Sequence, residues 1–169
     1  VQEAVNRCKE LISRPYPNFS FTWAPLHNDL YTADGARAED FRFPYADADF
    51  DFAWATSVFT HMDRNEVARY LLETRRVMRP GGRFLATFFL MDSQAEASSQ
   101  GGPYAFKVQR DGVWFMDAEV ISANVAFSPE DVEAMARAAG WSSVEVHFGR
   151  WSGRSGPTLD FQDLVLLRA

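Results

Sequence analysis

The central part of the sequence constrains the fold most, because it indicates a strand, a helix and a second strand in succession. The short apolar run Phe50–Thr56 is typical of a strand buried on both faces. Asp63, with Glu66 three residues later, forms the capping-box pattern of a helix N-terminus. The Pro-Gly-Gly segment 80–82 then ends the helix, and the apolar run Arg83–Leu90 predicts the second strand. Two strands joined by a helix are expected to lie parallel in one sheet.

The flanking segments predict further elements of an α/β fold. The N-terminal segment 1–13 is expected to form a helix that packs on a sheet through an apolar stripe of Val1, Val5, Cys8, Leu11 and Ile12, and a strand is expected over Phe19–Ala24. After the central part, the sequence predicts a loop over 92–103 and a hairpin at Asp111-Gly112. The last elements expected are a helix from Ser128-Pro129 to Gly140 and strands over Val144–Phe148 and Leu164–Leu167. This order predicts a mainly parallel sheet with helices on both faces and an antiparallel C-terminal strand pair. We expect a single domain over 1–169, with an insertion at about 92–126.

Composition excludes several classes of protein. The 169 residues include 17 basic and 23 acidic side chains, and the resulting charge of −6 disfavours nucleic-acid binding. No apolar run approaches the roughly 20 residues of a membrane-spanning helix. Because Cys8 is the only cysteine, an intramolecular disulfide is excluded and we expect no metal site. No secretory signal is recognisable, so the expected location is cytoplasmic.

The loop after the first apolar strand is the main candidate site, because ligands of open α/β sheets bind beyond the carboxyl ends of strands. Small polar residues there lead to His61 and then to the start of a helix. One interpretation is a loop capped by Ser57 and Thr60, with His61 on the surface; the other is a binding site. His27 and His147 have no partner pattern and are interpreted as structural or surface residues.

A longer pattern extends across this region. It consists of Phe43-Pro44-Tyr45, Asp47, Phe50-Asp51, Ser57-Val58-Phe59-Thr60-His61-Met62, Glu73 and Arg76-Val77-Met78-Arg79-Pro80-Gly81-Gly82-Arg83. In this order and spacing, the pattern resembles the middle of a class I S-adenosylmethionine-dependent methyltransferase. The resemblance implies a Rossmann-like sheet, here lacking the first two strands of the family.

The resemblance also implies S-adenosyl-L-methionine as cofactor and a small molecule as methyl acceptor. The residues assigned to the cofactor are Ala24, Pro25, Leu26, Thr56, Ser57, Val58 and His61. Segment 24–26 would pack on the adenine, with Pro25 at the place where the family usually has an acidic residue. Ser57 equally fits a helix cap. His61 is the candidate catalytic base, or a residue that shapes the cofactor pocket.

The insertion at 92–126 is expected to cover the acceptor as a lid. Its aromatic residues are Tyr104, Phe106, Trp114 and Phe115. The alternative is a hairpin whose aromatic side chains cover an edge of the core.

The glycine-rich turn of the family has no counterpart in this sequence. All ten glycines lie at or after Gly35, beyond the place of such a turn. We therefore expect an N-terminally truncated domain in which the strand at 50–56 has a bare apolar edge. Such an edge favours a homodimer through exposed sheet edges.

Two functions follow from these observations. The first is S-adenosylmethionine-dependent methyl transfer to a small-molecule acceptor, inactive or impaired in the truncated chain. The alternative is a non-catalytic binding or dimerisation remnant of the methyltransferase fold. No nucleic acid or membrane is expected as a partner. A nicotinamide-dependent enzyme would need a glycine fingerprint that the sequence lacks.

Overall fold

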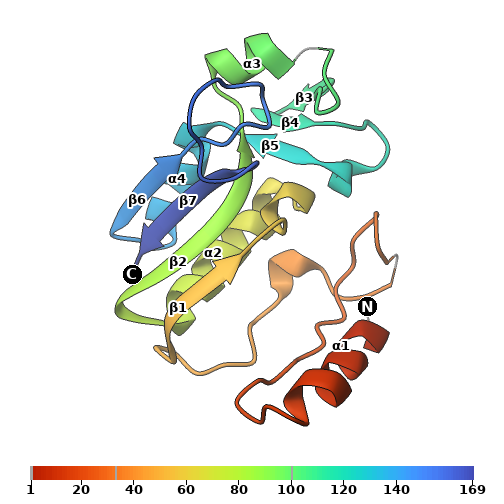
Figure 1. Ribbon diagram of the computed structural model, residues 1–169, viewed down its shortest axis with the longest axis vertical. Coiled ribbons are helices and arrows are strands. Elements are labelled where there is room, and N and C mark those ends of the chain that lie inside the picture. Colours follow the sequence, from red (N-terminus) through yellow and green to blue (C-terminus); the bar gives the residue numbers. More distant parts are fainter. Residues whose placement is uncertain (1, 33, 100) are drawn as a thin grey trace.

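The protein is described by a computed structural model that covers residues 2–32, 34–99 and 101–169 (Figure 1). The elements in chain order are α1 (Gln2–Cys8), β1 (Phe50–Ala55), α2 (Arg64–Val77), β2 (Met78–Leu90), α3 (Ser93–Ser99), β3 (Val108–Arg110), β4 (Val113–Phe115), β5 (Val125–Phe127), α4 (Pro129–Ala138), β6 (Ser143–His147) and β7 (Asp163–Arg168). The strands form one mixed sheet in the order β3-β4-β5-β2-β7-β6, with β1 paired to β2. The expected α/β fold is therefore confirmed.

The long strand β2 organises the sheet. One edge pairs with β7 in antiparallel orientation, and β7 pairs with β6 in the same way. The other edge pairs with β1 in parallel as far as Ala86, and with β5 in parallel from Phe89 onward. The expected parallel pair and antiparallel C-terminal pair are both present. The sheet as a whole is mixed, because the β3–β4 hairpin and its pairing with β5 add further antiparallel neighbours.

Helix α2 begins with the predicted capping box. The Asp63 carboxylate accepts a hydrogen bond from the Glu66 N–H, and the Glu66 carboxylate accepts one from the Asp63 N–H, each 2.9 Å long. The helix ends at Val77, and β2 begins at the next residue rather than at Arg83. Gly82 permits this tight transition, since a Cβ there would lie 2.9 Å from the Arg79 carbonyl oxygen.

The main core lies between the sheet and the helices α2 and α4, which contact each other. Phe59, Phe88 and Phe127 are fully buried, with the rings of Phe59 and Phe88 centred 5.1 Å apart. Helix α4 is capped by Ser128, whose hydroxyl accepts from the Asp131 N–H, and Pro129 occupies its first turn as predicted.

Only one face of the sheet around β1 is covered by helices, contrary to the expectation of helices on both faces (Figure 1). Phe52 and Trp54 of β1 stack on each other and are 50% and 68% exposed, so the strand is not buried on both faces. Trp54 aligns across the sheet with Leu85, which is half-buried. We call this surface, Phe52 with Trp54 and Leu85, the open face.

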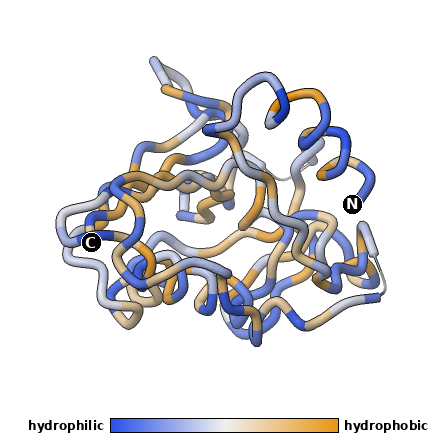
Figure 2. Tube along the Cα trace, turned by 90° about the horizontal axis from the view of Figure 1, so that it is seen from below, coloured by the Kyte–Doolittle hydropathy of each residue, from blue (hydrophilic) through white to orange (hydrophobic). Residues whose placement is uncertain are grey.

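The N-terminal region differs most from expectation. The predicted helix is present as α1 followed by a π-helical turn at Lys9–Ser13, but none of its described residues is buried. It therefore does not pack its stripe on a sheet, and Val1 lies outside the described residues. In Figure 2 this helix lies at the margin of the molecule, near the label N.

The predicted strand Phe19–Ala24 is wrong. Its residues have no regular secondary structure and pair with no strand among the described residues. A strand requires a hydrogen-bonding neighbour, and the alternating pattern alone does not supply one.

Two predictions concern the insertion. The segment 92–103 was expected as a loop, yet it contains helix α3, because the Asp92 carboxylate accepts from the Ala95 N–H and begins a helical turn. The hairpin at Asp111-Gly112 is confirmed. Both turn residues have positive φ, 51° and 78°, as a two-residue hairpin turn requires.

Candidate functional site

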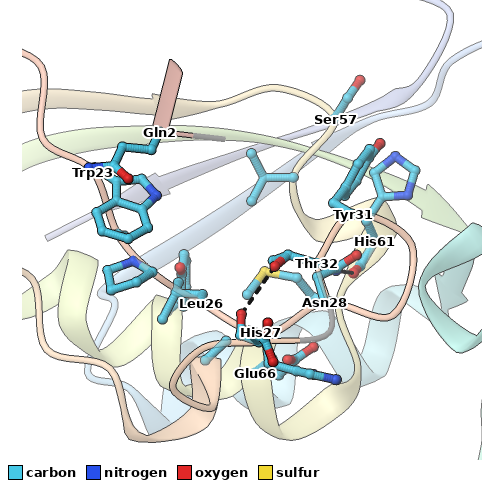
Figure 3. A pocket seen from close by; sticks show the side chains of 17 residues that line it. Gln2, Trp23, Leu26, His27, Asn28, Tyr31, Thr32, Ser57, His61 and Glu66 are labelled. Carbon is cyan, nitrogen blue, oxygen red and sulfur yellow. Dashed lines mark hydrogen bonds between the residues drawn. The ribbon is translucent and has the colours of Figure 1, made fainter. Parts of the chain in front are cut away.

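A cavity of about 550 Å³ lies beyond the carboxyl end of β1 (Figure 3). Four parts of the chain form it: Gln2 of α1, segment 23–38, the loop 57–62 and the first turns of α2. Apolar side chains dominate part of its wall, among them Pro25, Leu26, Val58 and Met62. A cavity of this size and position suits a small organic ligand.

The structure brings together nearly all the residues that the sequence assigned to the cofactor. Those that line this cavity are Ala24, Pro25, Leu26, Ser57, Val58 and His61. Thr56 is exposed and does not line it. Residues distant in sequence thus share one site, while their binding role stays a prediction.

Ser57 has a strained backbone at the end of β1. Its φ is 54°, in the left-handed region that residues with a side chain rarely adopt. The Ser57 N–H donates to the Thr87 hydroxyl at 2.8 Å, and the Ser57 hydroxyl donates to Gln162 Oε1 at 3.1 Å. The interpretation of Ser57 as a helix cap is wrong, since Asp63 caps α2. Such strain often occurs where a loop is shaped for binding.

His61 is held at the side of the cavity by three contacts. Its Nδ1 lies 2.8 Å from the Ser122 carbonyl oxygen, and the Tyr31 ring meets the imidazole edge to face. The Asn28 amide donates to the His61 carbonyl oxygen at 3.1 Å. A carbonyl can only accept, so Nδ1 carries a proton, and Nε2 of the neutral ring remains as a proton acceptor.

Segment 23–38 folds back on itself through backbone hydrogen bonds. The Ala36 N–H donates to the Pro25 carbonyl at 2.9 Å, and the Leu26 N–H donates to the Ala24 carbonyl at 3.0 Å. Gly35 allows this close approach, because a Cβ there would lie 2.6 Å from the Leu26 carbonyl carbon. The carbonyl groups of residues 24 and 25 are therefore already engaged within the segment.

The sequence interpretation did not identify Glu66 and Tyr70 as site residues. Both line the cavity from successive turns of α2. Burial raises the pKa of Glu66, outweighing the hydrogen bond from the Asp63 N–H that lowers it. Burial, together with the charge of Glu66, raises the pKa of Tyr70 to about 12. In the sequence, the capping box accounted for Glu66 as a helix residue, so no binding role was assigned to it. The i, i+4 spacing of Glu66 and Tyr70 places both on one face of α2, and this spacing was the signal that could have found them.

Other residues of segment 23–38 line the cavity without having been predicted to do so, and three of them carry aromatic rings. These three are Trp23, His27 and Tyr31. The interpretation of His27 as merely structural or superficial is incomplete, since it lies between this cavity and a neighbouring one of about 450 Å³.

Asp29 connects this segment to the insertion. Its carboxylate accepts from the N–H groups of Ile121 and Ser122, at 2.8 and 3.0 Å. Burial acts to raise the pKa of Asp29, but the hydrogen bonds from Ser122 and Ile121 outweigh it, so the pKa is lowered. The carbonyl of Ser122 also holds His61. The end of the insertion therefore positions the candidate base.

The aromatic residues of the insertion pack away from the cavity. Tyr104, Phe106 and Trp114 contact a small core cluster that contains Phe89 and Trp151, and none of them lines the cavity. This arrangement favours the alternative that these rings cover an edge of the core.

The described residues hold no cluster of three or more His, Cys, Asp or Glu side chains placed to bind a metal ion. In the same ranges, no helix is long and apolar enough to cross a bilayer.

Comparison with known proteins identifies the fold class. Residues 17–86 match a family described as a methyltransferase domain. The PH0226 protein from Pyrococcus horikoshii matches 99% of this chain and 68% of its own, with a TM-score of 0.58 at 14% identity. A structure from Methanosarcina mazei described as S-adenosylmethionine-dependent methyltransferases matches 80% of this chain at 17% identity, with a TM-score of 0.52. A third, from Mesorhizobium loti, matches 80% of this chain at 15% identity and 68% of its own, with a TM-score of 0.50.

The fold is therefore that of class I methyltransferases, and the predicted resemblance to the S-adenosylmethionine-dependent family is confirmed. The chain spans 65% of the length of the Methanosarcina mazei structure, less than two thirds.

Proposed function

We propose that the cavity beyond β1 binds S-adenosyl-L-methionine and that the protein transfers its methyl group to a small-molecule acceptor. One observation carries the proposal: segment 24–26 and the loop 57–61, far apart in sequence, line one cavity in the class I methyltransferase fold. The cofactor supplies an electrophilic methyl group bonded to a sulfonium.

The residues present suit such a ligand. Pro25, Leu26, Val58 and Met62 offer apolar surface to an adenine ring. Ser57 and Asn28 also line the cavity, and their polar side chains suit a ribose or an amino acid moiety. No glycine is among the described residues that line the cavity, so close backbone approach to the ligand is limited. We therefore expect weak cofactor binding by this chain.

His61 is proposed as the base. A hydroxyl or amine acceptor loses a proton when it gains a methyl group, and Nε2 of the neutral ring can accept that proton. The bond between Nδ1 and the Ser122 carbonyl fixes the tautomer and orientation of the ring. A His61→Gln variant would then lower the rate about 10²-fold, with cofactor affinity nearly unchanged.

Binding is tested by titrating the full chain with S-adenosylhomocysteine and following heat and the fluorescence of Trp23, which lines the cavity. We expect saturable binding that the Val58→Arg variant abolishes by filling the cavity. Leu159→Arg is the matched control, at an exposed position that does not line it. Absence of binding at millimolar ligand contradicts the proposal for this chain.

One observation favours the alternative of a non-catalytic association module. The open face exposes stacked aromatic rings, and β1 has a strand neighbour on only one edge within the described ranges. Self-association without any binding of S-adenosylhomocysteine would support this alternative. Light scattering after size-exclusion chromatography, alongside the titration, separates the two functions.

A further inference from the structure

The adenine of the proposed cofactor carries an exocyclic amino group, which donates hydrogen bonds and needs an acceptor in the site. This inference rests on the proposed function. Segment 24–26, which lines the cavity, has no acidic side chain, and its carbonyl groups at Ala24 and Pro25 already accept from Leu26 and Ala36. Within segment 24–26, only the Leu26 carbonyl is left as an acceptor without a partner among the described residues, and the side chains elsewhere in the cavity wall are the other candidates.

Glu66 is the acceptor that the fold places there. Figure 3 shows it at the base of the cavity, below Leu26 and beside His27. Its Oε2 is fixed by the Asp63 N–H at 2.9 Å, so the carboxylate has a defined orientation. Oε1 has no partner among the hydrogen bonds of the described residues, and Glu66 lines both this cavity and the neighbouring one.

We propose that Glu66 is the specificity-determining residue that recognises the adenine amino group through Oε1. The capping box thus has two roles, since the bond that begins α2 also orients the recognising oxygen. Burial already raises the pKa of this carboxylate. An amino N–H at Oε1 would favour the ionised form that accepts it.

The Glu66→Gln variant tests this with little risk to folding. Glutamine is also accepted at this position of a capping box, so its carbonyl can take the Asp63 N–H. Its amide NH₂ then faces the cavity and becomes a donor where the native residue is an acceptor. The variant should therefore prefer a ligand with an acceptor at that position.

The two probes are S-adenosylhomocysteine and S-inosylhomocysteine, which carries a 6-oxo group instead of the amino group. We expect the native chain to bind the adenosyl compound about tenfold more tightly, as one hydrogen bond to a charged acceptor allows. Glu66→Gln should lose or reverse this preference. Titration calorimetry measures both affinities, and thermal unfolding confirms that the variant is folded.

Glu130→Gln is the matched control, because Glu130 is an exposed glutamate in the first turn of α4 that does not line the cavity. It removes the same charge and should keep the native preference. If the Glu66→Gln variant is folded and keeps the tenfold preference, another acceptor, such as the Leu26 carbonyl, accepts the hydrogen bond from the amino group, and the proposal is overturned. If the native chain binds both probes equally, this proposal fails while the proposed function stands. If it binds neither, both fail.

Discussion

The two amphipathic helices α1 and α2 lie in regions of opposite character. Helix α2 buries five of its residues in the body, while α1, with an apolar stripe of its own, buries none of its described residues. The difference lies in what each helix faces, since β1 and β2 provide a surface only for α2. An apolar stripe predicts that a helix forms, and burial depends on a second surface.

The N-terminal region is held to the body by polar contacts as well as by apolar ones such as the packing of Phe43 on Tyr70. Arg76 donates to the carbonyl groups of Phe43 and Tyr45 and pairs with Asp47, while Glu73 accepts from the Phe43 N–H at 2.9 Å. These two α2 residues form what we call the polar clamp. The body is stabilised mainly by its core, whereas the polar clamp adds hydrogen bonds to the attachment of the N-terminal region, which leads to graded predictions.

The largest effect is expected in the core of the body. Phe88→Ala should lower the free energy of unfolding by about 3–5 kcal/mol, because it leaves a cavity beside Phe59 and Phe127. Urea denaturation measures the loss. Phe88→Leu, which keeps most of the volume, should cost roughly 1–2 kcal/mol. Equal losses for the two variants would contradict a close-packed core.

The polar clamp should rank next. Arg76→Ala leaves the buried Glu73 carboxylate without its closest cation, and we expect a loss of about 2–4 kcal/mol. Arg42→Ala, which removes an exposed pair with Asp47, should cost less than about 0.5 kcal/mol. A small loss for Arg76→Ala would mean that the N-terminal region has other attachments of similar strength.

The clamp also predicts a pH dependence. Burial acts to raise the pKa of Glu73, but the hydrogen bonds and charges of Arg76, with Phe43 and Arg69, outweigh it and lower the pKa. A lowered pKa contributes stability above the ordinary glutamate value, and this stability is lost as the pH falls through the folded-state pKa. Acidification should therefore lower the free energy of unfolding of the native chain more than that of the Arg76→Ala variant. Parallel slopes in the two proteins would contradict this.

Asp163 should give a smaller loss in the body. It is fully buried and accepts from the N–H groups of Leu90 and Gly149 and from the Trp151 indole. Asp163→Asn should cost about 1–3 kcal/mol, because one amide NH₂ must face a donor. Burial raises its pKa despite these bonds. Raising the pH from the ordinary aspartate value to the folded-state pKa should therefore reduce the native chain's advantage over the variant. The exposed Asp160→Asn is the control.

The open face should affect association more than stability. Trp54→Ser should leave the free energy of unfolding within about 0.5 kcal/mol and should reduce any self-association seen by light scattering. Leu159→Ser, an exposed apolar residue in the loop before β7, should change neither quantity. A monomer at all concentrations would exclude a homodimer, whether through the open face or through an exposed sheet edge.

The smallest effect is expected in α1. Leu11 is 61% exposed, so Leu11→Ala should change the free energy of unfolding by less than about 0.5 kcal/mol. Urea denaturation at high and low protein concentration provides the measurement. A loss above 1 kcal/mol would show that α1 is buried in solution by a surface outside the described contacts.

Elements whose signals are local were predictable from sequence. The capping box of α2, the Ser128-Pro129 start of α4 and the Asp111-Gly112 turn each depend on a few neighbouring residues, and each is present. Whether segment 19–24 forms a strand was not predictable in this way, because pairing depends on a distant segment. The failure of α1 to pack has the same cause.

The site was predictable to a similar degree. The loop 57–61 and segment 24–26 were located through the family pattern. Glu66 was recognised only as a helix cap, since its second contact surface exists only after α2 and segment 23–38 come together. The left-handed conformation of Ser57 occurs together with a hydrogen bond to Thr87, a residue 30 positions away, and has no signature in the sequence.

The change of partner along β2 determines the length that β1 can have. β1 pairs with β2 only as far as Ala86, and β5 pairs from Phe89 onward on the same edge, so Thr87 and Phe88 have no strand neighbour there within the described chain. The Ser57 N–H reaches Thr87 through this gap. Two residues inserted after Ala55 would extend β1 into the gap and displace the loop that carries His61. Length, as much as residue identity, is therefore restricted between Ala55 and His61.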